Sequence, residues 1–125
     1  MVIDHIGIAV ADAARSKVFY QQCLAPLELE LVVEIEGWCG FGQGAKAEFW
    51  FGEDEYAHRP MHIAFRAANR DSVDRFYQAG IAAGGRDNGA PGLREIYHPH
   101  YYGAFLIDPD GHNIEVVCHE SEDSQ

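Results

Sequence analysis

Two stretches of the chain, Asp4-His-Ile-Gly-Ile-Ala-Val10 and Met61-His-Ile-Ala-Phe-Arg-Ala67, decide the fold because they open the two copies of an internal repeat. An offset of 57 residues places His5 on His62, and the same offset places the tripeptide Phe-Tyr-Gln at 19–21 on its copy at 76–78. Agreement over a strand, a helix start and a helix face predicts that the two halves fold alike.

Each half begins with a strand-like run, followed by an Asp or Asn that caps a helix with an apolar stripe. Three more strand-like runs follow each helix, at 28–36, 38–41 and 47–51 and then at 93–97, 102–107 and 113–118. We therefore predict an α+β fold of two βαβββ modules in one domain spanning 1–125. Module one covers about 1–54, module two about 60–119, and an acidic tail at 120–125 is expected to be disordered.

Composition narrows the partners of the chain. Its formal charge is −11, from 20 acidic and 9 basic residues, which disfavours nucleic acid and anionic membranes and leaves a small-molecule substrate as the expected partner. No apolar run approaches the roughly 20 residues that span a bilayer. Three cysteines without a CxxC spacing are typical of reduced thiols, so we expect a cytoplasmic protein.

The last strand of each half carries a glutamate in a matching position. The stretch from Gly44 to Glu48 aligns with the stretch from Gly111 to Glu115, and in both the acid follows the glycine by four residues. The two-residue period of a strand places both glutamates on the face opposite the core, and the same argument places His5 and His62 there. Two imidazoles and two carboxylates facing one concave surface suit a divalent transition metal, with positions left for water or substrate.

The opening motif Asp4-His-Ile-Gly-Ile8 and the closing motif Asp108-Pro-Asp-Gly-His-Asn-Ile-Glu115 resemble those of the vicinal oxygen chelate superfamily, which contains glyoxalases, bleomycin-resistance proteins and extradiol dioxygenases. The resemblance extends over residues 2–118. It implies an eight-stranded, U-shaped mixed sheet around a metal site, a homodimer, and one divalent ion (Zn, Ni, Co, Mn or Fe). The implied metal ligands are His5, Glu48, His62 and Glu115.

Three functions follow from this resemblance. The first is a metal-dependent lyase or isomerase, in which the substrate chelates the metal through two oxygens and Glu115 or Glu48 moves a proton. The second is an Fe(II) extradiol-type dioxygenase, which needs only two His and one carboxylate and so dispenses with Glu48, whose face Trp50 shares. The third is a metal-free protein that sequesters a small molecule or drug, as bleomycin-resistance proteins do.

The aromatic and imidazole residues around the predicted site are interpreted as a substrate pocket. Trp50, Tyr97, His98 and Tyr102 are the expected substrate-binding residues. The glycine- and proline-rich segment that precedes them has two open interpretations, a pocket wall or a loop that packs on the sheet or on a second subunit. Three further histidines, at 58, 112 and 119, are expected at the surface.

Overall fold

The computed structural model describes residues 3–122, so the last three residues of the predicted disordered tail lie outside the described part. Module one runs β1 (Ile6–Val10), α1 (Ala13–Leu24), the short 3-10 helix η1 (Ala25–Leu27), β2 (Glu30–Ile35), β3 (Trp38–Gly42) and β4 (Phe49–Glu53). A second 3-10 helix, η2 (Glu55–His58), connects it to module two. This module runs β5 (His62–Arg66), α2 (Arg70–Ala82), β6 (Arg86–Leu93), β7 (Tyr102–Ile107) and β8 (Asn113–Cys118).

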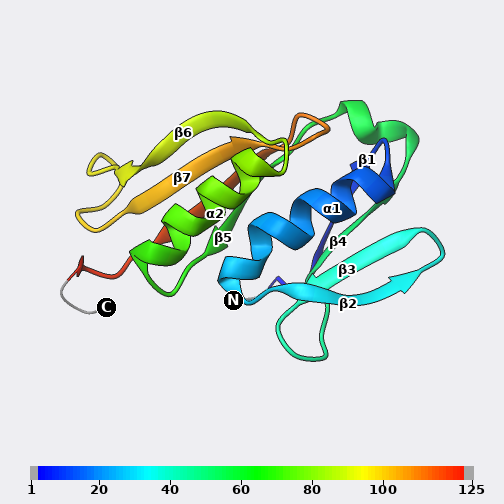
Figure 1. Ribbon diagram of the computed structural model, residues 1–125, viewed down its shortest axis with the longest axis horizontal. Coiled ribbons are helices and arrows are strands. Elements are labelled where there is room, and N and C mark those ends of the chain that lie inside the picture. The colour runs from blue at the N-terminus through cyan, green and yellow to red at the C-terminus, as the bar shows by residue number, and fades with distance from the viewer. Residues whose placement is uncertain (1–2, 123–125) are drawn as a thin grey trace.

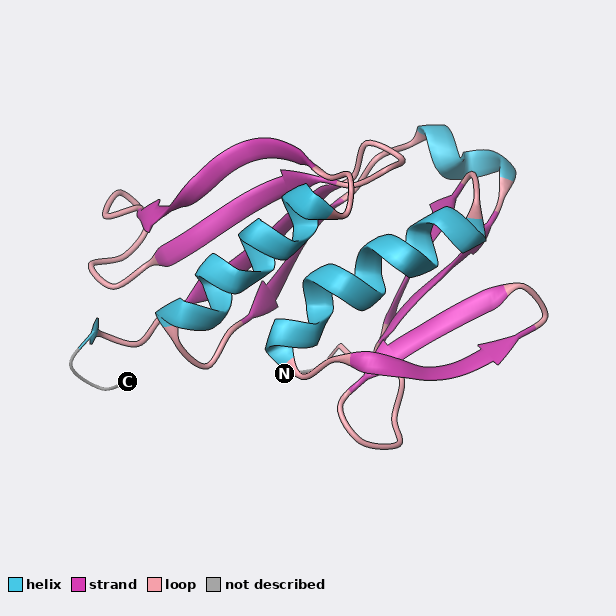
Figure 2. Cartoon of the chain, viewed as in Figure 1, coloured by secondary structure: helices cyan, strands magenta, loops and turns pink. Residues whose placement is uncertain are grey.

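Each module forms its own four-stranded sheet, in the order β1-β4-β3-β2 and β5-β8-β7-β6. The first strand of each module pairs with the last in parallel and the other ladders are antiparallel, so both sheets are mixed. In Figure 1 the helices α1 and α2 lie side by side at the centre of the molecule, with β6 and β7 on one side and β2 and β3 on the other. The colouring in Figure 2 shows the same arrangement by element type, and the α+β fold of two βαβββ modules is confirmed.

The predicted helix caps are present, and the apolar faces of the helices and sheets form one core that both modules share. Asp12 accepts a hydrogen bond from the Arg15 amide at the start of α1, and Asn69 accepts one from the Ser72 amide at the start of α2. Side chains from both helices and from the helix-facing side of both sheets are buried together. The largest are Tyr20, Phe19, Phe41, Phe51, Phe76, Ile8, Leu24 and Leu106.

The strand predicted at 93–97 is wrong. The strand β6 lies earlier, at Arg86–Leu93, in the segment whose glycines and proline had suggested a loop. It is an edge strand with two irregularities in its pairing with β7, and edge strands tolerate Pro91 and the glycines because one side of their backbone needs no partner. Residues 94–101 form the loop between β6 and β7 instead.

The closing motif joins the modules to each other. His112 is fully buried, which corrects the expectation that it lies at the surface. Its Nδ1 accepts from the Met61 amide at 2.9 Å and its Nε2 donates to the Ala9 carbonyl at 2.9 Å. Asp108 accepts from the Tyr20 hydroxyl at 2.6 Å and Asp110 from the Ala11 amide at 2.8 Å. The motif therefore fixes module two against β1 and α1 of module one.

Candidate metal centre

Two of the predicted metal ligands, a histidine and a glutamate, are in contact in module two. His62 is the first residue of β5 and Glu115 the third of the neighbouring strand β8, both on the face away from the helices. His62 Nε2 lies 2.9 Å from Glu115 Oε1. The glutamate side chain is only 3% exposed whereas the imidazole is 54% exposed, so a buried carboxylate meets an accessible nitrogen at this point.

A tyrosine is hydrogen-bonded to the second oxygen of the same carboxylate. The Tyr101 hydroxyl, from the loop before β7, donates to Glu115 Oε2. Burial, followed by the hydrogen bond to Glu115, raises the pKa of Tyr101 well above its usual value. The tyrosine therefore keeps its proton near neutral pH and acts as a donor, which satisfies a carboxylate that burial would otherwise leave unpaired.

The two predicted ligands of module one lie in a different setting. His5 and Glu48 precede β1 and β4, and the Ile6 amide bonds the Glu48 carbonyl at 2.9 Å, so they are neighbours at the start of two parallel strands. Both are exposed. His5 Nδ1 bonds Asp4 at 2.7 Å, and among residues 3–122 the Glu48 carboxylate has no hydrogen-bond partner.

Within one chain the four predicted ligands do not come together. Over the described residues 3–122, no group of three or more His, Cys, Asp or Glu side chains is close enough to hold a metal ion. The structure pairs His62 with Glu115 and places His5 beside Glu48. The chain thus carries two separate pairs, one in each module.

The strand registers correct the alignment on which Glu48 was chosen. In module one Gly7 pairs with Trp50, and in module two the equivalent residue Ala64 pairs with Glu115. Trp50 is therefore the structural counterpart of Glu115, and Glu48 corresponds to Asn113. In the last strand, the offset between equivalent residues of the two modules is therefore two residues smaller than in the sequence alignment.

Two tryptophans cover the face of the first sheet on which Trp50 lies. An added Cβ at Gly52 would come within 2.4 Å of the Trp38 ring, and one at Gly40 within 3.0 Å of the Trp50 ring. These glycines therefore let both indoles lie directly against the sheet. Each tryptophan remains half-buried, so its outer surface is open to a ligand or to another protein surface.

The four residues predicted to bind substrate fall in three places. Trp50 lies on the open face of the first sheet, as described above. Tyr97 and His98 are exposed in the 94–101 loop, where Tyr97 packs edge-on against Tyr101 at 5.1 Å and His98 packs against His119 at 5.6 Å. Tyr102 faces the other way and donates to Asp74 on α2 at 2.6 Å. Burial, followed by this hydrogen bond, raises the pKa of Tyr102 to about 12.

Sequence reasoning missed three residues that surround Glu115. Besides Tyr101, the ring of Phe105 lies 6.3 Å from the ring of His62, and the guanidinium of Arg94 lies 5.5 Å from the Phe105 ring. Arg94 also donates to the carbonyls of Gly92, Ala90 and Gly103. For Phe105 the alternation of β7 carried the signal, because Ala104 and Leu106 belong to the core and Phe105 pairs with Glu115; Tyr101 and Arg94 lie outside this strand.

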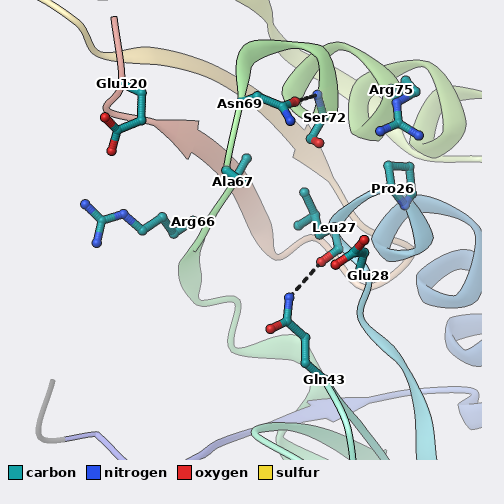
Figure 3. Close-up of a pocket in the computed structure, with 11 residues that line it drawn as sticks. Pro26, Leu27, Glu28, Gln43, Arg66, Ala67, Asn69, Ser72, Arg75 and Glu120 are labelled. Carbon is teal, nitrogen blue, oxygen red and sulfur yellow. Dashed lines mark hydrogen bonds between the residues drawn. The ribbon is translucent and has the colours of Figure 1, made fainter. Parts of the chain in front are cut away.

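The surface has two depressions near the junction of the modules, and one of them includes the His5–Glu48 pair. One, of about 450 Å³, is lined by His5 and Glu48 from module one and by Ala64 and Arg66 from module two. The other lies between η1 and the start of α2, and Figure 3 shows the Gln43 amide donating to the Leu27 carbonyl and the Asn69 cap accepting from Ser72. Arg66, Arg75, Glu28 and Glu120 surround this second depression, so its charges are mixed, and it contains none of the four predicted ligands.

Comparison with known proteins places the chain in a family. A model of the Glyoxalase/Bleomycin resistance protein/Dioxygenase superfamily matches residues 2–116. The chain belongs to this superfamily. None of the functionally curated proteins compared with it matched significantly.

Solved structures agree with this assignment. A glyoxalase/bleomycin resistance protein from Albidiferax ferrireducens is 26% identical, with a TM-score of 0.82 over 96% of this chain and 100% of its own. A glyoxalase/bleomycin resistance protein/dioxygenase family enzyme from Burkholderia phytofirmans is 20% identical, with a TM-score of 0.73 over 94% and 98%. A lactoylglutathione lyase from Agrobacterium tumefaciens is 17% identical, with a TM-score of 0.69 over 94% and 92%. The last two likenesses establish the fold.

Between residues 3 and 122, no helix combines the length and the apolar composition that crossing a bilayer requires.

Proposed function

We propose that this protein is a metal-dependent enzyme that binds a small, oxygen-rich substrate through two of its oxygen atoms. Its divalent ion would be held by His62 and Glu115 of one subunit and by His5 of a second copy of the chain. The observation that carries the proposal is the buried Glu115 carboxylate with His62 Nε2 2.9 Å from its Oε1.

The geometry of this pair fits a transition metal. Two ligand atoms at right angles around an ion, each with a bond of about 2.1 Å, lie about 3.0 Å apart. The separation of 2.9 Å between His62 and Glu115 matches that value, and both side chains offer the N and O atoms that such ions bind. When bound, the metal would supply Lewis acidity to the two oxygens of the substrate.

A second copy is proposed because, among residues 3–122, no third side chain of the kinds that bind metals joins His62 and Glu115. His62 and Glu115 are together, whereas His5 lies apart on the first sheet. A twofold dimer that brings the open face of the first sheet opposite the open face of its partner's second sheet would place His5 near His62 and Glu115 twice. The half-buried Trp50 would then line the same pocket as a stacking surface for the substrate.

The remaining residues would bind and orient the substrate. Phe105 and the outer face of Trp50 offer apolar contact and exclude water, and Tyr97 and His98 lie on the loop that borders Glu115. Tyr102 is left out of the proposed pocket because it faces Asp74 on α2. Glu115 is the carboxylate best placed to accept or return a proton.

The strand register favours the oxygenase alternative over the lyase. With Trp50 at the position equivalent to Glu115, the ligand set reduces to two histidines and one carboxylate. This is the set that non-haem Fe(II) oxygenases use. A lyase or isomerase that moves a proton with a second glutamate would lack that group here. Of the two activities, we therefore propose extradiol-type ring cleavage first and lyase or isomerase chemistry second.

The cytosolic location predicted from the sequence is kept here as part of the proposal. All three cysteines, at 23, 39 and 118, are free and buried. This supports the proposed cytosolic location, where thiols stay reduced.

Elemental analysis of protein purified without chelators tests the proposed function. We expect close to one transition-metal ion per chain, lost in His62→Ala and in His5→Ala. Iron would direct assays to oxygen-dependent cleavage of catechols, and zinc, nickel, cobalt or manganese to lyase and isomerase substrates. Absence of bound metal even after a panel of divalent ions is added back would contradict the proposal and favour the drug-sequestering alternative.

A further inference from the structure

We propose that Tyr101 is the positioning residue of this centre: it holds one oxygen of Glu115 so that only the other binds the metal. The inference rests on the proposed function, because it assigns a role within the same site. Glu115 Oε2 accepts from the Tyr101 hydroxyl, and Oε1 lies against His62. The two oxygens of a single buried carboxylate are thus given two different tasks.

The position of Tyr101 is fixed by the loop that carries it. The Arg94 amide donates to the Tyr101 carbonyl at 2.7 Å, and the Tyr101 amide donates to the His98 carbonyl at 3.0 Å. These bonds close the 94–101 loop on itself at the end of β6. The ring also packs edge-on against Tyr97 at 5.1 Å and His119 at 5.3 Å. The position of the hydroxyl is therefore fixed by hydrogen bonds of the backbone and by packing of the ring against two neighbouring rings.

A glycine leaves room for this arrangement. Gly103 stands on β7 beside both partners, and an added Cβ would lie 3.3 Å from the Tyr101 ring and 3.6 Å from Glu115 Oε2. No side chain separates the hydroxyl from the carboxylate at this point.

The arrangement has a consequence for the metal. A hydrogen bond from outside the coordination sphere orients a carboxylate ligand. Here the bond from Tyr101 would hold Oε2 away from the ion, so that Glu115 would bind through Oε1 alone. Single-oxygen binding leaves one more position on the ion, and a substrate that chelates through two oxygens needs two free positions. Loss of the hydroxyl would free Oε2 to reach the ion and would also leave Glu115 less well oriented.

The chain offers a matched control in the next residue. Tyr102 also donates to a carboxylate, that of Asp74 at 2.6 Å, but on the helix side of the second sheet. Tyr101→Phe and Tyr102→Phe each remove one hydroxyl from a half-buried tyrosine that bonds an acid, and only the first touches the proposed ligand.

The test is cobalt(II) binding to full-length wild type, Tyr101→Phe and Tyr102→Phe, by competition with a chromophoric chelator and by visible absorption. We expect Tyr101→Phe to bind about 10- to 100-fold more weakly. Its cobalt bands should weaken as the coordination number rises, while Tyr102→Phe matches wild type in both. Gly103→Ala, which moves the ring but keeps the hydroxyl, should shift affinity in the same direction by less.

The outcomes separate this inference from the proposed function. Wild type that binds no cobalt contradicts the proposed function and this inference with it. Wild type that binds, with Tyr101→Phe equal to Tyr102→Phe in affinity or in spectrum, overturns the role of Tyr101 alone. Circular dichroism of the metal-free variants checks that each is folded.

Discussion

The two modules have the same backbone plan but opposite surfaces on their open faces. In module two the residue that pairs with Ala64 is Glu115, buried and bonded to His62 and Tyr101. In module one the equivalent residue, paired with Gly7, is Trp50, whose indole lies over Gly40. One repeat thus carries a polar, pre-arranged pair of metal donors, and the other carries an aromatic surface with an exposed His5 at its edge.

Under the proposed function, this difference means that the two repeats divide the work of the site between them. Module two provides most of the proposed coordination, because its carboxylate is desolvated and already oriented. Module one provides one imidazole and a stacking surface. One chain contains both halves, but no third donor joins the His62–Glu115 pair among residues 3–122, which is why we infer that the complete centre needs two copies.

The largest expected effect comes from exchanging the two glutamates for their amides. Glu115→Gln should weaken metal binding by more than about 100-fold, because a direct ligand loses its charge and outer-sphere partners alone account for about 10- to 100-fold. Glu48→Gln should change affinity by less than about 3-fold, since Glu48 corresponds to Asn113. Competition titration with a chelator measures both; equal losses would show that Glu48 is a ligand after all.

The next variant makes module one resemble module two. Trp50→Glu places a carboxylate at the position equivalent to Glu115 and should tighten metal binding by about 10-fold. It should also lower the free energy of unfolding by about 1–3 kcal/mol, because the indole packed on Gly40 is lost. Trp50→Gln is the control, with the same loss of packing and no gain in affinity. A gain in metal affinity in both variants would show that the gain comes from removal of the indole and not from the new carboxylate.

A pair of glycine variants compares how tightly the two open faces are packed. Gly52→Ala should lower the free energy of unfolding by about 1–3 kcal/mol, since the new methyl would lie 2.4 Å from the Trp38 ring. Gly103→Ala should cost less than about 1 kcal/mol, since its nearest contact, with Tyr101, is 3.3 Å. Urea unfolding of the metal-free proteins measures both, and the reverse order would contradict the described packing of Trp38.

The smallest effect concerns the alkaline stability of module two. The folded pKa of Tyr102 is about 12, above the value near 10 of an unfolded tyrosine. Folded protein thus holds the proton more strongly, so this stabilisation is complete below about pH 10 and is lost as pH rises toward about 12. Between about pH 10 and pH 12, the free energy of unfolding of wild type should fall relative to that of Tyr102→Phe. Urea midpoints at about pH 9 and pH 11.5 would show no such difference if the hydroxyl were not buried against Asp74.

Much of the fold could be predicted from the sequence because strong local signals agreed with one another. The repeat fixed the order of elements, Asp12 and Asn69 cap their helices, and the apolar residues of the last strands, such as Phe51 and Val116, are buried as expected. The period of two also placed Glu115 on the correct face.

The register of the last strand could not be predicted for a physical reason. A slip of one residue would have turned Glu48 into the core, but a slip of two leaves every side chain on its face. The apolar pattern is therefore equally satisfied by matching Glu48 or Trp50 to Glu115, and only the ladder from β1 to β4 decides. Likewise, Tyr101 lies in a loop whose path depends on contacts with His98 and His119 that no local pattern reports.

The most direct test of the shared centre is to mix two variants that each lack a different ligand. His5→Ala and Glu115→Gln are unfolded together, refolded, and assayed for bound metal. If the site is shared, a mixed dimer has one intact site, and random pairing restores about a quarter of the wild-type metal content. Each variant alone should bind close to none. Mixed protein that binds no more metal than the separate variants would contradict a centre built from two subunits.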